Sequence, residues 1–168
     1  YPDYYKSMKF KGKRKREQMR VPSHVDLVSD LKQRKWLPCI FFVFSRKKCE
    51  SHARELMKRF DFATSEDKIE IIKTFREMLD DKIKNMASVN FVRQLVTRGI
   101  AVHHAGLLPN LKEIVEVLFS KGLIKVLYTT ETFAVGVNMP ARTVCFDSLR
   151  KFDGMTFRYL HSKEYFQL

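Results

Sequence analysis

The chain has 168 residues, of which 45% are hydrophobic, so it can bury one sizeable core and falls within the usual size of a single domain. Its formal net charge is +13, of which residues 1–35 carry +7, and this favours a polyanionic partner, although charge alone leaves RNA, DNA and an anionic membrane surface open. No apolar run approaches the roughly 20 residues of a membrane span and no signal peptide begins the chain, so we expect a soluble, intracellular protein.

The first 22 residues are rich in Lys and Arg and show little apolar periodicity. We expect residues 1–22 to form an exposed basic linker or arm, either a solvated charge run or a segment for nucleic-acid binding or localisation. The chain begins at Tyr1 rather than at Met, which is typical of a fragment. Residues 23–168 are expected to form one folded domain.

The first helix is expected from Ser23, which can cap it, to about Lys35. The continuously apolar run Cys39–Phe44 then predicts a central strand that is covered on both faces. Another helix should follow, with an apolar stripe made of Cys49, Ala53, Leu56, Met57 and Phe60. A strand therefore leads into a helix.

Two further helical patterns lengthen the connection to the next strand. One starts at Ser65, and its expected buried side consists of Ile69, Ile72, Phe75 and Leu79. The other runs from about Val89 to Arg98 and ends at Gly99, a residue type that favours helix C-termini. We derive no function for these helices from their sequence.

A short strand is next expected at Ile100–His104, followed by a helix that ends at Gly122. Residues 123–128 and then Thr143–Asp147 predict two more strands. Alternating strands and helices with short joints are typical of an α/β fold with a doubly wound parallel sheet and helices on both faces.

Polar residues follow three of the expected strands. They are Ser45–Arg46, His104–Gly106 and Thr129–Glu131. In open parallel sheets, ligands bind outside the carboxyl ends of the strands, and hydroxyls, an imidazole and glycine-exposed amides suit the phosphate oxygens of a polynucleotide. Ser45 has a plain alternative role, since it can simply cap the following helix.

Metal sites have little support in the sequence. His103 and His104 should point to opposite faces of a strand, so they cannot bind one metal together. We expect His103 to pack in the core or against a helix, and His104 to be the better phosphate contact. The three cysteines, at positions 39, 49 and 145, show no metal-binding spacing and indicate a reducing compartment.

Nucleotide-binding signatures are also missing from the sequence. Gly12 and Lys13 are followed by Arg14, so they do not complete the phosphate-binding pattern G-x-x-x-x-G-K-[ST], and there is no G-x-G-x-x-G. The chain alone therefore has no recognisable loop for a triphosphate.

Four stretches together resemble the second RecA-like domain of the superkiller-type DExH-box RNA helicases, which belong to superfamily 2 and are associated with the exosome. The resemblance covers about residues 36–168. It is carried by Phe42–Glu50, Arg98–Pro109, Leu118–Gly122 and Thr130–Thr143. The stretches Phe146–Gly154 and Leu37–Phe41 look nearer to the cytosolic superkiller helicase than to its nuclear exosome-associated relative.

The resemblance implies a set of site residues. Ser45 and Arg46 would fall in helicase motif IV, His104 to Gly106 in the next RNA-contacting motif, and Thr129 and Thr130 at the start of motif V. It implies that Thr130 contacts the RNA backbone, and that two later residues of motif V approach the nucleotide. These two residues are Gly136 and Asn138. The arginine-bearing motif VI should begin at Gln167, so we expect the catalytic set to be incomplete in this fragment.

The resemblance further implies ATP and magnesium as cofactors of the full-length enzyme, with none held by this fragment alone. The implied partners are single-stranded RNA, a first RecA-like domain of the same chain, and the RNA exosome with its adaptor proteins, without a membrane. A cytoplasmic location is expected, with a nuclear one as the alternative. Two other functions stay open: a non-catalytic RecA-like module that binds nucleic acid or protein, and a DNA helicase of the same superfamily.

Overall fold

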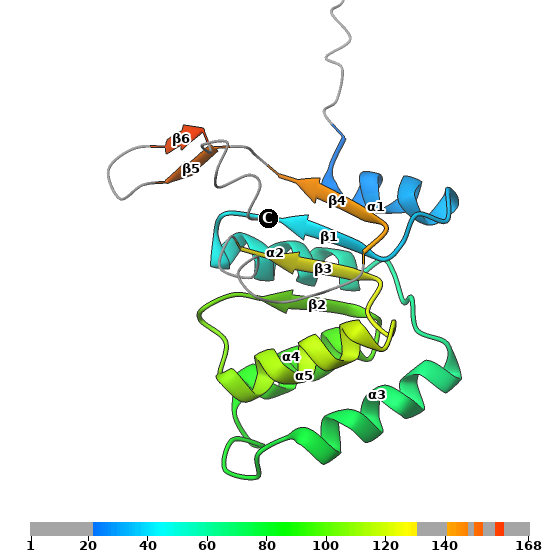
Figure 1. Cartoon of the computed structure of the whole chain (residues 1–168), viewed down its shortest axis with the longest axis vertical. Coiled ribbons are helices and arrows are strands. Elements are labelled where there is room, and N and C mark those ends of the chain that lie inside the picture. Colours follow the sequence, from blue (N-terminus) through cyan, green and yellow to red (C-terminus); the bar gives the residue numbers. More distant parts are fainter. Residues whose placement is uncertain (1–21, 131–140, 148–149, 153–156, 160–168) are drawn as a thin grey trace, which may run out of the picture.

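The computed structural model describes residues 22–130, 141–147, 150–152 and 157–159 (Figure 1). The expected basic arm therefore lies almost wholly outside the described residues, as does most of the loop after Thr130. The helices are α1 His24–Gln33, α2 Arg46–Met57, α3 Ser65–Met78, α4 Ala87–Val96 and α5 Pro109–Ser120. The strands are β1 Cys39–Phe42, β2 Ile100–His103, β3 Val126–Thr129, β4 Thr143–Phe146, β5 Arg150–Phe152 and β6 Phe157–Tyr159.

The main sheet has four strands in the order β2-β3-β1-β4, and every neighbouring pair is parallel. Figure 1 shows the four arrows pointing the same way, so all carboxyl ends meet at one edge of the sheet. The predicted α/β fold with a parallel sheet is confirmed, and this architecture is that of a RecA-like domain. A separate antiparallel pair, β5 with β6, follows the sheet and was not predicted.

Helices cover both faces of the sheet. Phe41 and Tyr128 are register partners on β1 and β3, and the ring of His52 from α2 lies against both. On the opposite face, His103 of β2 makes a 2.8 Å contact with Glu116 of α5. Since successive side chains of a strand point to opposite faces, α2 and α5 lie on opposite sides of the sheet.

Local signals in the sequence set several helix ends. Ser23 and Thr64 each form a capping box with an aspartate three residues later, and Ser45 accepts a hydrogen bond from the Lys48 amide. Gly99 and Gly122 both have a φ of +74°, a left-handed conformation that glycine adopts without a Cβ clash. The predicted helix starts at Ser23 and Ser65 and the glycine ends agree with these bounds.

The core forms where the strands and helices meet. All four residues of β1, β2 and β3 are buried, which agrees with the continuously apolar runs of the first two strands. Helix α5 contributes five buried side chains, and α4 contributes four. None of the helices in the described ranges combines the length and the apolar composition needed to cross a bilayer.

The expected buried side of α3 was wrong in part. Ile69 is 70% exposed and Ile72 is 46% exposed, whereas Ile71, Thr74 and Phe75 form the buried face. The reason is that α3 packs on α5 rather than on the sheet. A neighbouring helix covers a narrow stripe, and α3 has more isoleucines than this stripe can bury.

Candidate nucleic-acid interface

The carboxyl ends of β2, β3 and β1 are joined by backbone hydrogen bonds just past the strands. The amide of Val43 donates to the Thr129 carbonyl at 2.8 Å, and the amide of Thr130 donates to the His103 carbonyl at 3.3 Å. These bonds carry the parallel pairing one residue beyond the strands. The polar segments that the sequence singled out therefore leave the sheet side by side.

Ser45 and Arg46 sit where β1 turns into α2. Ser45 is exposed, and its hydroxyl accepts a 3.3 Å hydrogen bond from the Lys48 amide. Ser45 therefore acts as the N-cap of α2, the alternative to an RNA contact that the sequence left open. Arg46 and Lys47 are exposed in the first helical turn, which contains no acidic residue. The positive end of the helix dipole and two cations thus make this corner favourable for an anion.

His104 lies inside the fold at this edge. It is 4% exposed, its Nδ1 accepts a 3.0 Å hydrogen bond from the Gly106 amide, and its Nε2 lies 3.0 Å from Glu50 Oε1. Because Nδ1 accepts, the proton is on Nε2, which donates to the carboxylate. Both ring nitrogens are therefore engaged by the protein, and the imidazole orients the loop instead of facing solvent.

Ala105 and Gly106, which follow His104 in this loop, are exposed residues. Glycine has a clear role here, since a Cβ at position 106 would lie 3.0 Å from His104 Nδ1 and 3.5 Å from Arg46 Cδ. The same distances show that the structure brings Arg46, His104 and Gly106 together. A side chain at position 106 would separate them or displace the ring.

Thr129 and Thr130 end the central part of the sheet. Thr129 is fully buried, and its hydroxyl donates to the His103 carbonyl at 2.8 Å, which ties β3 to β2 at the edge. Thr130 is 8% exposed. The structure thus assigns the Thr129 hydroxyl to the fold, while Thr130 is the last described residue before the loop of motif V.

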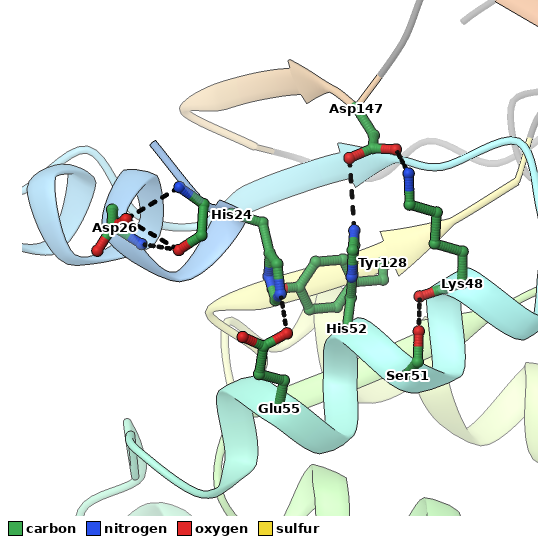
Figure 2. A network of polar contacts seen from close by, with 9 residues as sticks. His24, Asp26, Lys48, Ser51, His52, Glu55, Tyr128 and Asp147 are labelled. Atoms are coloured by element: carbon green, nitrogen blue, oxygen red, sulfur yellow. Dashed lines mark hydrogen bonds and ion pairs between the residues drawn. The ribbon is translucent and has the colours of Figure 1, made fainter. Parts of the chain in front are cut away.

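A polar network links β4, α2 and α1 next to this edge (Figure 2). Asp147, just after β4, is ion-paired with Lys48 and lies 3.4 Å from His52 Nε2. Burial raises the pKa of Asp147, but Lys48 and, to a smaller extent, His52 together outweigh this and hold the pKa below its usual range. Asp147 therefore fixes the end of β4 to the first turn of α2.

The network continues to α1 through stacked imidazoles. The rings of His24 and His52 stack with centroids 3.8 Å apart, and His24 contacts both Tyr128 Oη at 2.7 Å and Glu55 at 2.9 Å. Burial lowers the pKa of His52, because the charged form loses its hydration there. Figure 2 shows these side chains clustered between α1, α2 and the sheet.

His24, His52 and Glu55 are close enough to be considered as a metal site. The ring geometry is unsuitable, since nitrogen lone pairs lie in the ring planes and the two stacked planes are only 18° from parallel. Both nitrogens of His24 also have protein partners. We therefore assign this cluster to the packing of α1 on α2.

Three predicted site residues fall outside the described residues. They are Gly136 and Asn138, expected on the nucleotide side, and Gln167, expected at the start of motif VI. The predicted site residues that the structure describes are those expected on the RNA side.

Sequence reasoning missed the carboxylates of this edge. Glu50 and Asp147 hold His104 and Lys48 in place, yet neither was considered. Asp147 carried a usable signal, since it directly follows a predicted strand as the other site residues do. Glu50 carried none, because its partner lies 54 residues away in sequence.

The sequence of this chain was compared with those of known proteins and protein families. No model of a protein family matches the chain. It is 48% identical over 151 residues to the human exosome RNA helicase MTR4, covering 88% of this chain and 14% of the relative. It is also 48% identical over 148 residues to human superkiller complex protein 2, covering 86% of this chain and 12% of the relative.

A plant relative agrees with the two human ones. The DExH-box ATP-dependent RNA helicase DExH10 of Arabidopsis thaliana is 45% identical over 145 residues, which cover 84% of this chain and 14% of the relative. The chain thus spans only about a seventh of the length of these relatives. It is a homologue of one segment of the superkiller-type, exosome-associated DExH-box RNA helicases.

Proposed function

We propose that this chain is the second motor domain of an ATP-dependent RNA helicase, an ATP hydrolase. In this role it grips the backbone of single-stranded RNA and completes an ATP site together with a first RecA-like domain. The observation that carries the proposal is the gathering, at one edge of a parallel sheet, of the Arg46 and Lys47 cations and the exposed residues Ala105 and Gly106. The names of the relatives support RNA as the substrate.

The grip follows from the chemistry of this edge. Arg46 and Lys47 supply charge, and the first amides of α2 point in the same direction as the positive end of the helix dipole. Gly106 has no side chain that would block a close-lying phosphate, while its own amide is held by His104 Nδ1. Such contacts hold a strand in place without reading its bases, so the proposed grip is indifferent to RNA sequence.

The nucleotide side of the proposal rests on residues outside the described ones. Gly136 and Asn138 would face the nucleotide, and ATP with magnesium would supply the free energy for stepwise movement when bound between the two domains. The chain's own part is to hold the RNA at its sheet edge while the cleft opens and closes. Because its sequence has no triphosphate loop, we expect no hydrolysis by the chain alone.

The biological setting is a narrower proposal. The names of the relatives include the exosome and the superkiller complex, which supports a role in RNA decay with the exosome and its adaptor proteins. We retain a cytoplasmic location, with a nuclear one as the alternative. The identity to MTR4 and to superkiller complex protein 2 is 48% in both cases, so identity favours neither.

RNA binding by the chain tests the grip. The double substitution Arg46→Glu with Lys47→Glu should weaken binding of a fluorescein-labelled oligouridylate by tenfold or more and reduce its salt dependence. The matched control is Lys73→Glu with Arg76→Glu, which makes the same charge change on the exposed side of α3. Equal losses in both variants would contradict a specific site at the sheet edge.

The full-length protein tests the activity. Strand displacement is measured on matched RNA and DNA duplexes with ATP, and we expect the RNA duplex to be unwound. Preference for DNA would support the DNA helicase, and binding without any ATP hydrolysis would support the non-catalytic module. Thr130→Val should lower RNA-stimulated ATP hydrolysis, and wild-type behaviour of this variant would remove Thr130 from the site.

A further inference from the structure

A second cluster of cations lies at the opposite edge of the sheet, where the strands begin. Lys125 directly precedes β3, Arg142 directly precedes β4, and Lys35 lies in the turn between α1 and β1. Since β3, β1 and β4 are neighbours and start in register, these three residues come together. Together with Lys32 of α1 they line an open pocket of about 380 Å³.

Within the part of the chain that the structure describes, the cations of this pocket are not paired with carboxylates. Among the described residues, Lys32, Lys35, Lys125 and Arg142 form no ion pair with a carboxylate. Lys125 and Arg142 donate instead to backbone carbonyls, at 2.8 and 2.9 Å. The one carboxylate in the pocket lining, Asp61, is already ion-paired with Lys68. Among the described residues, four cations thus line an open pocket whose carboxylate, Asp61, is paired with a different lysine.

Aromatic rings accompany these cations. Phe60 and Phe62 stack at a centroid distance of 5.3 Å, and the Lys32 ammonium lies over both rings, at 5.4 and 5.7 Å from their centroids. Trp36, the single tryptophan of the chain, is 50% exposed beside Lys35, with Arg34 over its ring at 5.2 Å. Cations interleaved with aromatic rings are the combination that binds phosphates and stacks unpaired bases.

The backbone at Lys35 is a separate observation at the same pocket. Helix α1 ends in a Schellman motif, in which the Trp36 amide bonds to the Leu31 carbonyl and the Lys35 amide bonds to the Lys32 carbonyl. Lys35 occupies its left-handed position with a φ of +59°, where glycine is favoured. A lysine at this position carries backbone strain that a glycine would relieve, as residues held in place for function often do.

We propose that this far-edge patch, made of Lys32, Lys35, Lys125, Arg142, Phe60 and Phe62, is a second binding site for single-stranded RNA. The phosphates lie against the four cations and an unpaired base stacks near the phenylalanines. The site is separate from the grip at the carboxyl edge, because it lies where the strands begin (Figure 1). This second site depends on the proposed function in one respect only, namely that the polyanion it binds is RNA.

The test compares two triple variants of the chain in binding oligouridylate. Lys32→Glu, Lys35→Glu and Lys125→Glu together should lower the affinity by tenfold or more and reduce the slope of log K against log salt by about 2. The control carries Lys73→Glu, Arg76→Glu and Lys84→Glu, the same charge change at exposed cations outside the patch. Its affinity should fall less than threefold. Equal losses in the two variants would overturn the proposal.

Trp36 provides a direct readout of the patch. RNA should quench its fluorescence in the native chain and not in the far-edge triple variant, and an unchanged emission at saturating RNA would overturn the proposal. Lys35→Gly separates binding from folding, since it should raise the melting temperature and yet weaken RNA binding. Unaltered RNA binding by Lys35→Gly would also count against the site.

The two RNA proposals can fail separately. If the far-edge variant binds as the control does while Arg46→Glu with Lys47→Glu loses affinity, only the second site is refuted. If the carboxyl-edge variant keeps its affinity while the far-edge variant loses it, the grip of the proposed function is refuted instead.

Discussion

Replacing Thr129 by valine tests whether its hydroxyl belongs to the fold or to an RNA contact. Valine has nearly the same shape, so the change removes little packing but takes away the hydroxyl's bond to the His103 carbonyl and its longer, 3.3 Å contact with the Thr130 carbonyl. The hydroxyl is fully buried and donates to the His103 carbonyl at 2.8 Å. That carbonyl would keep only the longer, 3.3 Å bond from the Thr130 amide. The variant should therefore be destabilised in the absence of RNA.

The size of the effect follows from the burial of the bond. A neutral hydrogen bond contributes about 1 kcal/mol, and a buried carbonyl that loses its better partner costs somewhat more, so we expect a loss of about 1–2 kcal/mol. For a chain of this size, 1 kcal/mol corresponds to roughly 2–4 °C in melting temperature. Thr129→Val should thus lower the melting temperature by about 2–8 °C.

Urea unfolding followed by circular dichroism measures this loss, and a lower midpoint with an unchanged slope is expected. The matched control is Thr97→Val, because the Thr97 hydroxyl donates only to carbonyls of its own helix and is partly exposed. If Thr129→Val is no less stable than this control but loses RNA affinity, the hydroxyl contacts RNA and our reasoning is wrong.

Three further predictions concern a loop, a helix face and a buried histidine. Gly106→Ala should cost about 1–3 kcal/mol and weaken RNA binding, because the added Cβ would lie 3.0 Å from the ring of His104; wild-type stability and binding would contradict this. Ile71→Ala should cost about 2–5 kcal/mol and Ile69→Ala less than about 1 kcal/mol, since Ile71 is fully buried and Ile69 is 70% exposed; equal losses in urea unfolding would show that α3 packs differently. Burial lowers the pKa of His103 from 6.5, so the neutral histidine stabilises the fold above pH 6.5 and this contribution is lost as the pH falls through the folded pKa. His103→Gln should therefore flatten the fall in stability below pH 6.5. An unchanged pH profile would exclude His103 as the source of that fall.

The sheet and the helix ends were predictable because their causes are local. A continuously apolar run such as residues 39–44 is typical of a strand covered on both faces, and Ser23 or Gly99 marks a helix end through its own hydrogen bonding or dihedral angles. The buried face of α3 was not predictable in this way. Periodicity identifies an apolar stripe, whereas the neighbouring helix α5 decides how much of it is covered.

At the candidate site, the sequence indicated which segments meet but not what their side chains do. Topology alone places residues 45, 104 and 129 at one edge of a parallel sheet. The partner of His104 is a carboxylate 54 residues earlier, and the partner of Thr129 is a carbonyl 26 residues earlier. Such long-range pairs have no local signature. The far-edge cations escaped notice for the same reason, since only the register of three strands brings them together.

The placement of α3 has a consequence for how this domain unfolds locally. The connection from β1 to β2 contains α2, α3 and α4, and α3 packs on α5 at a distance from the strand ends (Figure 1). A helix attached through one face can unfold locally while the sheet stays intact. Amide hydrogens of α3 should then exchange with solvent well before those of β1 and β3. Length changes around α3 would be tolerated there without moving the residues that hold the strand ends together.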